Sequence, residues 1–110
     1  MANTYKRLGA INPSANTQTN VYVVPAATQA VISTIAICNQ AATNASYSLM
    51  VMPTYSATTP ATDFIVRGAT VPAADTIFLT IGLTANATTV VAANTSSPNV
   101  SLSIFGSEIT

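Results

Sequence analysis

The sequence contains no histidine and no tryptophan, and it has one cysteine and few charged residues. Without histidine, the most frequent general base and metal ligand of proteins is missing. Its three carboxylates, Asp63, Asp75 and Glu108, are isolated in the sequence and form no paired-carboxylate motif. Cys38 has no histidine to activate it and is predicted to be a buried, inert thiol. We therefore predict that the protein is not an enzyme and that it binds no metal or cofactor.

Charge of both signs is scarce. Charged residues make up 5% of the chain, against about 25% in an ordinary soluble domain, and the net charge is zero. A neutral chain lacks the attraction that dominates binding to a phosphate backbone, so we expect no nucleic-acid partner. It also lacks the repulsion that keeps free proteins apart at high concentration. This composition favours a protein that functions within an assembly.

Long apolar runs are also missing. The longest, around residues 30–38, has about half the length that a membrane-spanning helix needs, so no membrane partner is expected. Lys6 and Arg7 precede the polar segment INPSANTQTN, which does not resemble the apolar part of a signal peptide. We therefore expect the protein to be made and used without Sec export.

The region 30–53 carries the strongest structural pattern. Two apolar runs, AVISTIAIC and SYSLMVMP, are joined by the polar connector NQAATNA. Both runs show alternation with period two, which places successive side chains on opposite faces of a strand. The connector is too long for a two-residue turn and has the composition of an exposed loop. We predict two strands that pair with each other in an antiparallel hairpin.

The same alternation recurs along the chain. It predicts further strands over residues 20–25, 63–67, 75–83, 88–93 and 100–109. In the segment 75–83, Phe78 and Thr80 share the face opposite the aliphatic residues, and in the last strand Phe105 faces outward. About seven or eight short antiparallel strands separated by turn residues predict an all-β fold, a β-sandwich of the jelly-roll or immunoglobulin-like type.

Residues 1–19 are predicted to be an extended N-terminal arm, and residues 20–110 to be the sandwich domain. Within the arm, TYKRLGAI is also compatible with a short edge strand. Two interpretations of the arm stay open. It is a loose tail, or it is a docking arm in which Tyr5, Lys6 and Arg7 bind an acidic or carbonyl-rich patch of a partner.

Four stretches together resemble a family of small virion proteins of tailed bacteriophages, including phages of cyanobacteria. They are VYVVPAATQAVISTIAICNQA, SYSLMVMP, AADTIFLTIGL and NVSLSIFGSEIT. The resemblance covers most of residues 20–110 and lies in framework and turn residues. It implies a β-sandwich structural protein, foremost a capsid cement or decoration protein on the outer surface of the shell. It further implies a homotrimer that binds the major capsid protein and is assembled into the virion in the host cytoplasm.

Two alternatives stay open beside the cement protein. Tail and baseplate structural modules also use small sandwiches. A receptor- or glycan-binding module on the virion surface would need exposed aromatic platforms, for which Tyr22, Tyr47 and Tyr55 are the candidates. The strand positions of Tyr22 and Tyr47 favour packing in the core for these two residues. No small-molecule substrate is expected, and the sequence leaves the strand order and the oligomeric state open.

Overall fold

A computed structural model describes residues 3–54 and 61–110. The strands are β1 (Asn3–Ile11), β2 (Thr19–Val23), β3 (Gln29–Asn39), β4 (Ala45–Met52), β5 (Phe64–Val71), β6 (Thr76–Ala85), β7 (Val90–Thr95) and β8 (Val100–Ile109). One short 3₁₀ turn, η1 (Ala61–Asp63), precedes β5. No α-helix is present in the described part of the chain, which confirms the predicted all-β class.

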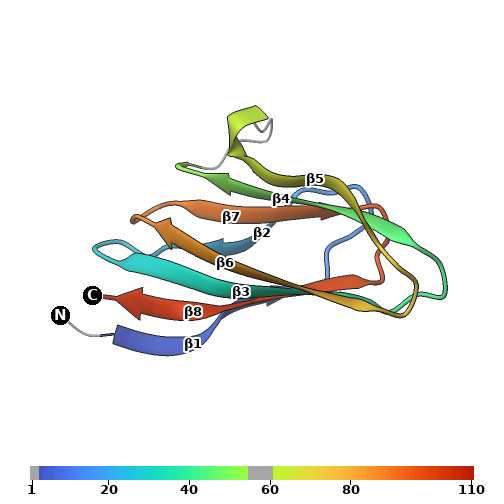
Figure 1. The fold of residues 1–110 in the computed structure, drawn as a ribbon. Helices are drawn as coiled ribbons and strands as arrows, with labels where there is room; N and C mark the ends of the chain where they lie inside the picture. The colour runs from blue at the N-terminus through green and yellow to red at the C-terminus, as the bar shows by residue number, and fades with distance from the viewer. Residues whose placement is uncertain (1–2, 55–60) are drawn as a thin grey trace.

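The strands form two four-stranded antiparallel sheets that pack face to face as two layers (Figure 1). Sheet A has the order β1-β8-β3-β6, and sheet B has the order β2-β7-β4-β5. Antiparallel partners are nested, since β1 pairs with β8, β2 with β7, β3 with β6 and β4 with β5. This is the strand order of a jelly roll and not that of an immunoglobulin domain. The predicted β-sandwich is confirmed.

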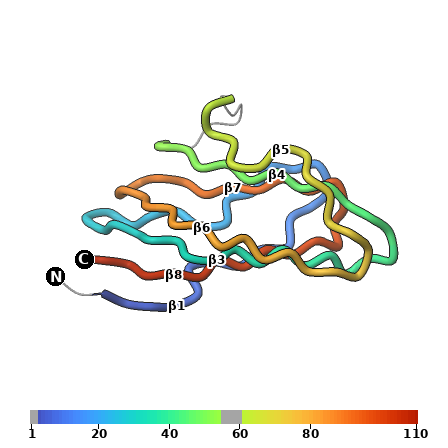
Figure 2. The backbone as a smooth tube through the Cα atoms, viewed as in Figure 1, coloured from blue at the N-terminus to red at the C-terminus, as the bar shows by residue number. Residues whose placement is uncertain are grey.

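The predicted hairpin between residues 30 and 53 is wrong. β3 lies between β8 and β6 in sheet A, whereas β4 lies between β7 and β5 in sheet B. The connector over residues 40–44 crosses from one layer to the other (Figure 2). Alternation specifies which face of a strand is buried but not which strand lies beside it. Two strands that face each other across a core therefore carry the same pattern as two strands of one hairpin.

The N-terminal segment belongs to the sandwich. β1 pairs with β8 from Asn3 opposite Ile109 to Ile11 opposite Leu102, at the edge of sheet A. The expected boundary after residue 19 therefore does not separate an arm from the sheets over residues 3–11. Few side chains of β1 are buried, so its place is fixed chiefly by backbone hydrogen bonds to β8.

The core lies between the two inner faces. Its largest fully buried aliphatic side chains include Ile32, Ile37, Leu49, Leu102 and Ile104. On β6 the aliphatic face predicted from the sequence packs against this core and is half-buried. The alternation predicted for 75–83 and 100–109 is thus confirmed.

β-Bulges lie at the same height on β1 and β3 of sheet A, and they shift the alternation of inward and outward side chains. Ile32 and Ile35 both face the core although they are three residues apart, because the register shifts at Ser33. Leu8 is the matching extra residue of β1. Between these two bulges lies Gly106 of β8, where a Cβ atom would overlap the carbonyl oxygen of Val31. Only glycine allows the β8 and β3 backbones to approach this closely.

Asn39 ends β3 as a fully buried polar residue. Its Nδ2 donates hydrogen bonds to the carbonyl oxygens of Thr43 at 2.9 Å, Val71 at 3.2 Å and Pro72 at 3.3 Å. Its Oδ1 accepts a hydrogen bond from the backbone N–H of Ala41 at 3.0 Å. The side chain thereby fastens the β3–β4 crossing to the end of β5, and buried backbone groups that lie away from any ladder gain partners.

Candidate interaction surface

Sites for chemistry are scarce in this structure. Within residues 3–54 and 61–110, no group of three or more Cys, Asp or Glu side chains is placed to hold a metal ion. No helix in these same ranges is long and apolar enough to cross a membrane. The carboxylate of Asp75 accepts a hydrogen bond from the N–H of Thr76 at 2.8 Å, so it begins β6 from a turn.

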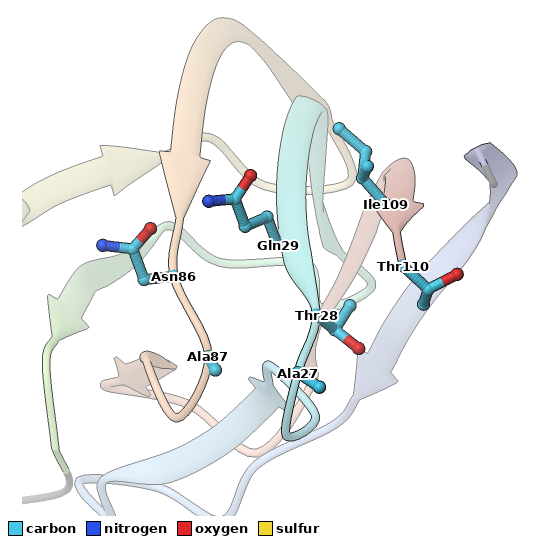
Figure 3. A pocket seen from close by; sticks show the side chains of 7 residues that line it. All are labelled: Ala27, Thr28, Gln29, Asn86, Ala87, Ile109 and Thr110. Atoms are coloured by element: carbon cyan, nitrogen blue, oxygen red, sulfur yellow. The ribbon is translucent and has the colours of Figure 1, made fainter. Parts of the chain in front are cut away.

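An open pocket of about 460 Å³ lies at the end of the sandwich where the β2–β3 and β6–β7 turns meet the C-terminal end of β8 (Figure 3). It is lined by Ala27, Thr28, Gln29, Asn86, Ala87, Ile109 and Thr110. The lining includes no charged side chain, and the amides of Gln29 and Asn86 are its main polar groups. The side chains of this pocket can form hydrogen bonds, but they include no carboxyl, imidazole, thiol or amine group.

A broader surface is the outer face of sheet A, which is the face turned away from sheet B. The outward positions follow from the strand registers and their alternation with core residues. They include Tyr5, Arg7, Ala10, Val31, Thr34, Ala36, Cys38, Phe78, Thr80, Thr84, Ser101, Ser103, Phe105 and Ser107.

Three aromatic side chains stand out on this face. Tyr5 is 81% exposed, Phe78 is 67% exposed and Phe105 is 40% exposed. They are the exposed aromatic residues of the described chain, and they come from β1, β6 and β8. Arg7, on the edge strand β1, is the one charged side chain among the outward positions given above. The face is therefore aromatic and almost uncharged, with small residues between its rings.

Lys6 points to the other side of β1 and does not belong to this face. Its Nζ lies 2.9 Å from Oε1 of Glu108, whose side chain is 14% exposed. The other carboxylate oxygen of Glu108 accepts a hydrogen bond from the Tyr22 hydroxyl at 2.5 Å. Because Tyr22 belongs to β2, this chain of contacts joins β1 and β8 of sheet A to sheet B.

The contacts of Glu108 shift two pKa values in opposite directions. The hydrogen bond from Tyr22, followed by the contact with Lys6, holds the pKa of Glu108 below its usual value. Burial, together with the hydrogen bond to the Glu108 carboxylate, raises the pKa of Tyr22 well above its ordinary value. Both shifts preserve the ionised carboxylate and the neutral phenol over the middle of the pH range.

The structure separates the three residues proposed from the sequence as a partner-binding set. Tyr5 and Arg7 share the outer face of sheet A, while Lys6 is paired within the chain. Their binding to a partner stays a prediction. Sequence reasoning missed that Tyr5 lies on the same surface as Phe78 and Phe105. The alternation marked both phenylalanines as outward, but nothing local shows that their strands share a sheet with β1.

Other sequence expectations have mixed outcomes. Tyr22 and Tyr47 are 8% and 4% exposed and pack in the core, as their strand positions predicted. They cannot serve as exposed platforms, and Tyr55 lies outside the described residues. Cys38 is half-buried on the outer face of sheet A rather than buried. Its outward neighbours include small residues, so part of its surface stays open.

Comparison with protein-family models and with curated proteins finds no match to this chain.

Proposed function

We propose that this protein is a structural subunit of a phage virion, a capsid cement or decoration protein that binds the outer shell and bridges subunits of the major capsid protein. The observation that carries this proposal is the outer face of sheet A, with three exposed aromatic rings and one charged side chain. Aromatic enrichment with depletion of charge is the composition of the centre of a protein–protein interface. Large apolar side chains left exposed on one face of a domain mark a candidate interaction site.

The fold and the composition support the same proposal. Jelly rolls occur in viral capsid and lectin domains, although a fold by itself does not determine function. Because charges are few, contacts to a partner are mostly apolar or made through backbone groups, and ion pairs are scarce. The resemblance of four sequence stretches to phage virion proteins supplies the particle as the setting.

The mechanism is stabilisation by binding. A specific interface of ordinary size covers about 800 Å² on each partner. A subunit that contacts two neighbouring capsid proteins adds its binding free energy to the contact between them. Self-association, as a trimer if the resemblance holds, turns several weak contacts into one strong attachment on a repeating lattice.

Electron microscopy of intact particles, with a count of copies per particle, tests this proposal. We expect hundreds of copies on the outer shell. Tens of copies or fewer, located at the tail or baseplate, would favour the tail module instead.

Salt resistance is a second test of the cement role. At about 1 M salt the Debye length is about 3 Å, so attachment through ion pairs is lost while apolar attachment persists. We expect the protein to stay on particles after this treatment, and release by the salt step alone would contradict an uncharged interface.

One observation favours a second candidate function, a glycan- or receptor-binding module. The exposed rings of Tyr5, Phe78 and Phe105 offer flat apolar surfaces on which a sugar can stack. A glycan array with the full chain tests this role, and an array without hits leaves it unsupported. Deletion of residues 1–19 would remove β1 from sheet A, so the role of Tyr5 and Arg7 is better tested by substitution of those two side chains.

A further inference from the structure

We propose that the outer face of sheet A is covered by the same face of a second copy of this chain, in a twofold face-to-face pair. This goes beyond the proposed function, because it names a second copy of the chain as the occupant of that surface whether or not the protein belongs to a particle. Three properties of the face support a second copy as that occupant: the order of large and small side chains, the placement of charge, and the area.

The strand registers arrange the face in rows that cross all four strands. Each row contains one aromatic side chain, with small side chains at most of its other positions. Written in the order β1, β8, β3, β6, the rows are Tyr5–Ser107–Val31–Thr84, then Arg7–Phe105–Thr34–Thr80, then Ala10–Ser103–Ala36–Phe78. The aromatic residue moves from β1 to β8 to β6 along the three rows, so no two rings occupy the same strand.

This order makes the face complementary to itself. A twofold axis in the interface, parallel to the strands and between β8 and β3, exchanges β8 with β3 and β1 with β6, and it keeps each row opposite itself. Phe105 then faces Thr34 of the second copy, and Tyr5 faces Thr84 of the second copy. Phe78 faces Ala10 of the second copy. Every large ring meets a small side chain, as an interface between identical patches requires.

The position of Arg7 keeps the two positive charges of the pair apart. Arg7 is on the edge strand, and the same twofold axis places the two Arg7 residues at opposite edges of the interface, offset by about 14 Å across the strands for a strand spacing of about 4.8 Å. That separation exceeds the Debye length of about 8 Å at physiological salt. A partner with a charged surface would instead leave its charges desolvated against an uncharged face.

The area is adequate for a stable pair. Four strands of about nine residues cover roughly 600 Å² in projection, and protruding side chains add to the accessible surface. Specific interfaces cover about 800 Å² on each partner. A threefold ring needs two different patches that meet head to tail, whereas this face is matched to itself.

Light scattering and sedimentation of the full chain test this arrangement. The informative comparison is between substitutions of opposite charge at Thr80. Thr80 faces Arg7 of the second copy in the pair, but within one chain it lies three strands away from Arg7. We expect a dimer whose dissociation constant is roughly tenfold larger for Thr80→Lys than for Thr80→Glu. Thr70→Lys and Thr70→Glu, on exposed β5 of sheet B, form the matched control and should not differ.

Cys38 supplies an independent readout because it is the only cysteine and lies on the same face. We expect its rate of alkylation to fall as protein concentration rises through the dissociation constant. A protein that stays monomeric at high concentration, or a dimer that is indifferent to the sign of charge at position 80, overturns the proposal.

Analysis of purified particles distinguishes failure of this proposal from failure of the virion role. If the protein binds the shell as a monomer with its sheet A face on a capsid protein, the twofold pair is wrong and the cement role stands. If the charge-sensitive dimer forms but never co-purifies with particles, the cement role is wrong and the pair stands.

Discussion

The outer faces of the two sheets differ in how far their apolar side chains are covered by the rest of the chain. On sheet B the outward residues Met50, Met52, Val90 and Ala92 are at most 4% exposed and form a small second core. Phe64 packs against this cluster, and the guanidinium of Arg67 lies 4.6 Å from the centre of its ring. η1 lies against β4 on the same side (Figure 1). On sheet A the described residues provide no such cover for Tyr5, Phe78 and Phe105.

This difference separates two uses of apolar surface. Residues covered within the chain contribute to the free energy of folding of the monomer. Residues left uncovered contribute nothing comparable until another molecule covers them. Substitutions on the sheet B side should therefore alter unfolding, and substitutions on the sheet A side should alter association.

The largest effect is expected at Gly106, where the β8 backbone lies closest to that of β3. Gly106→Ala places a methyl group against the backbone of β3, which cannot move without breaking its pairing with β8. We expect a loss of about 4 kcal/mol or more in the free energy of unfolding, measured with urea. Gly82→Ala is the matched control, because a Cβ there meets nothing within 4 Å, and it should change stability by at most about 0.5 kcal/mol.

A pair of truncations tests the two faces directly. Met52→Ala empties a fully buried site on sheet B and should lower the free energy of unfolding by about 3 kcal/mol. Phe78→Ala removes a larger but exposed ring and should change monomer stability by at most about 0.5 kcal/mol, while weakening self-association. Urea titration and light scattering measure the two effects, and equal losses of monomer stability would remove the distinction between the faces.

Asn39 links the end of β3 in sheet A to the end of β5 in sheet B. Asn39→Asp replaces its donating amide by a carboxylate oxygen that faces three carbonyl groups. We expect the free energy of unfolding to fall by about 2 kcal/mol, because donors and acceptors no longer match in a buried site. Asn20→Asp, at an exposed position of β2, introduces the same charge and should have little effect in the same urea titration.

The smallest effect concerns the contact of Glu108 with Tyr22 and Lys6. Because these contacts lower the pKa of Glu108, their stabilisation is present above its ordinary value of about 4.3 and is lost as pH falls below it. Glu108→Gln should cost about 1 kcal/mol at pH near 7 and progressively less in acid, as followed by thermal unfolding. Lys6→Met, which leaves the Tyr22 hydrogen bond in place, should cost less than Glu108→Gln.

The raised pKa of Tyr22 predicts a loss of folding stability at alkaline pH. Ionisation of tyrosine in the unfolded chain favours unfolding, so the stabilisation is present below the ordinary pKa of about 10 and is lost as pH rises past it. In Tyr22→Phe this alkaline loss should be smaller than in the unaltered protein. An identical alkaline slope in the two proteins would contradict the buried position of the Tyr22 hydroxyl.

The sequence predicts the strands and their faces well, because alternation is local. The alternation correctly places Ile77 inward and Phe78 outward on β6, and Ile104 inward and Ser103 outward on β8. Strand neighbours are not local, so the pairing of β3 with β6 and β8 instead of β4 could not be read from the pattern. Glycine inside a strand signals close backbone approach, and Gly106 carried that signal.

The candidate surface was predictable only in parts. The outward positions of Phe78 and Phe105 follow from alternation, but their common surface with Tyr5 depends on β1 joining β8. Tyr5, Lys6 and Arg7 are adjacent in the sequence, and this adjacency suggested that they form one binding patch. In a strand, neighbours point to opposite sides, and Lys6 accordingly meets Glu108 while Tyr5 and Arg7 face outward.

The nested strand order has a consequence for synthesis. β8 lies between β1 and β3, so during synthesis β1 has no hydrogen-bonded strand neighbour until β8 has been made. Pairing over such sequence separations is slow, and it exposes unpaired edges in the interval. Sheet A, with the row that carries Phe105, cannot exist on a nascent chain that still lacks β8. The proposed pair therefore requires a chain whose synthesis has reached the end of β8.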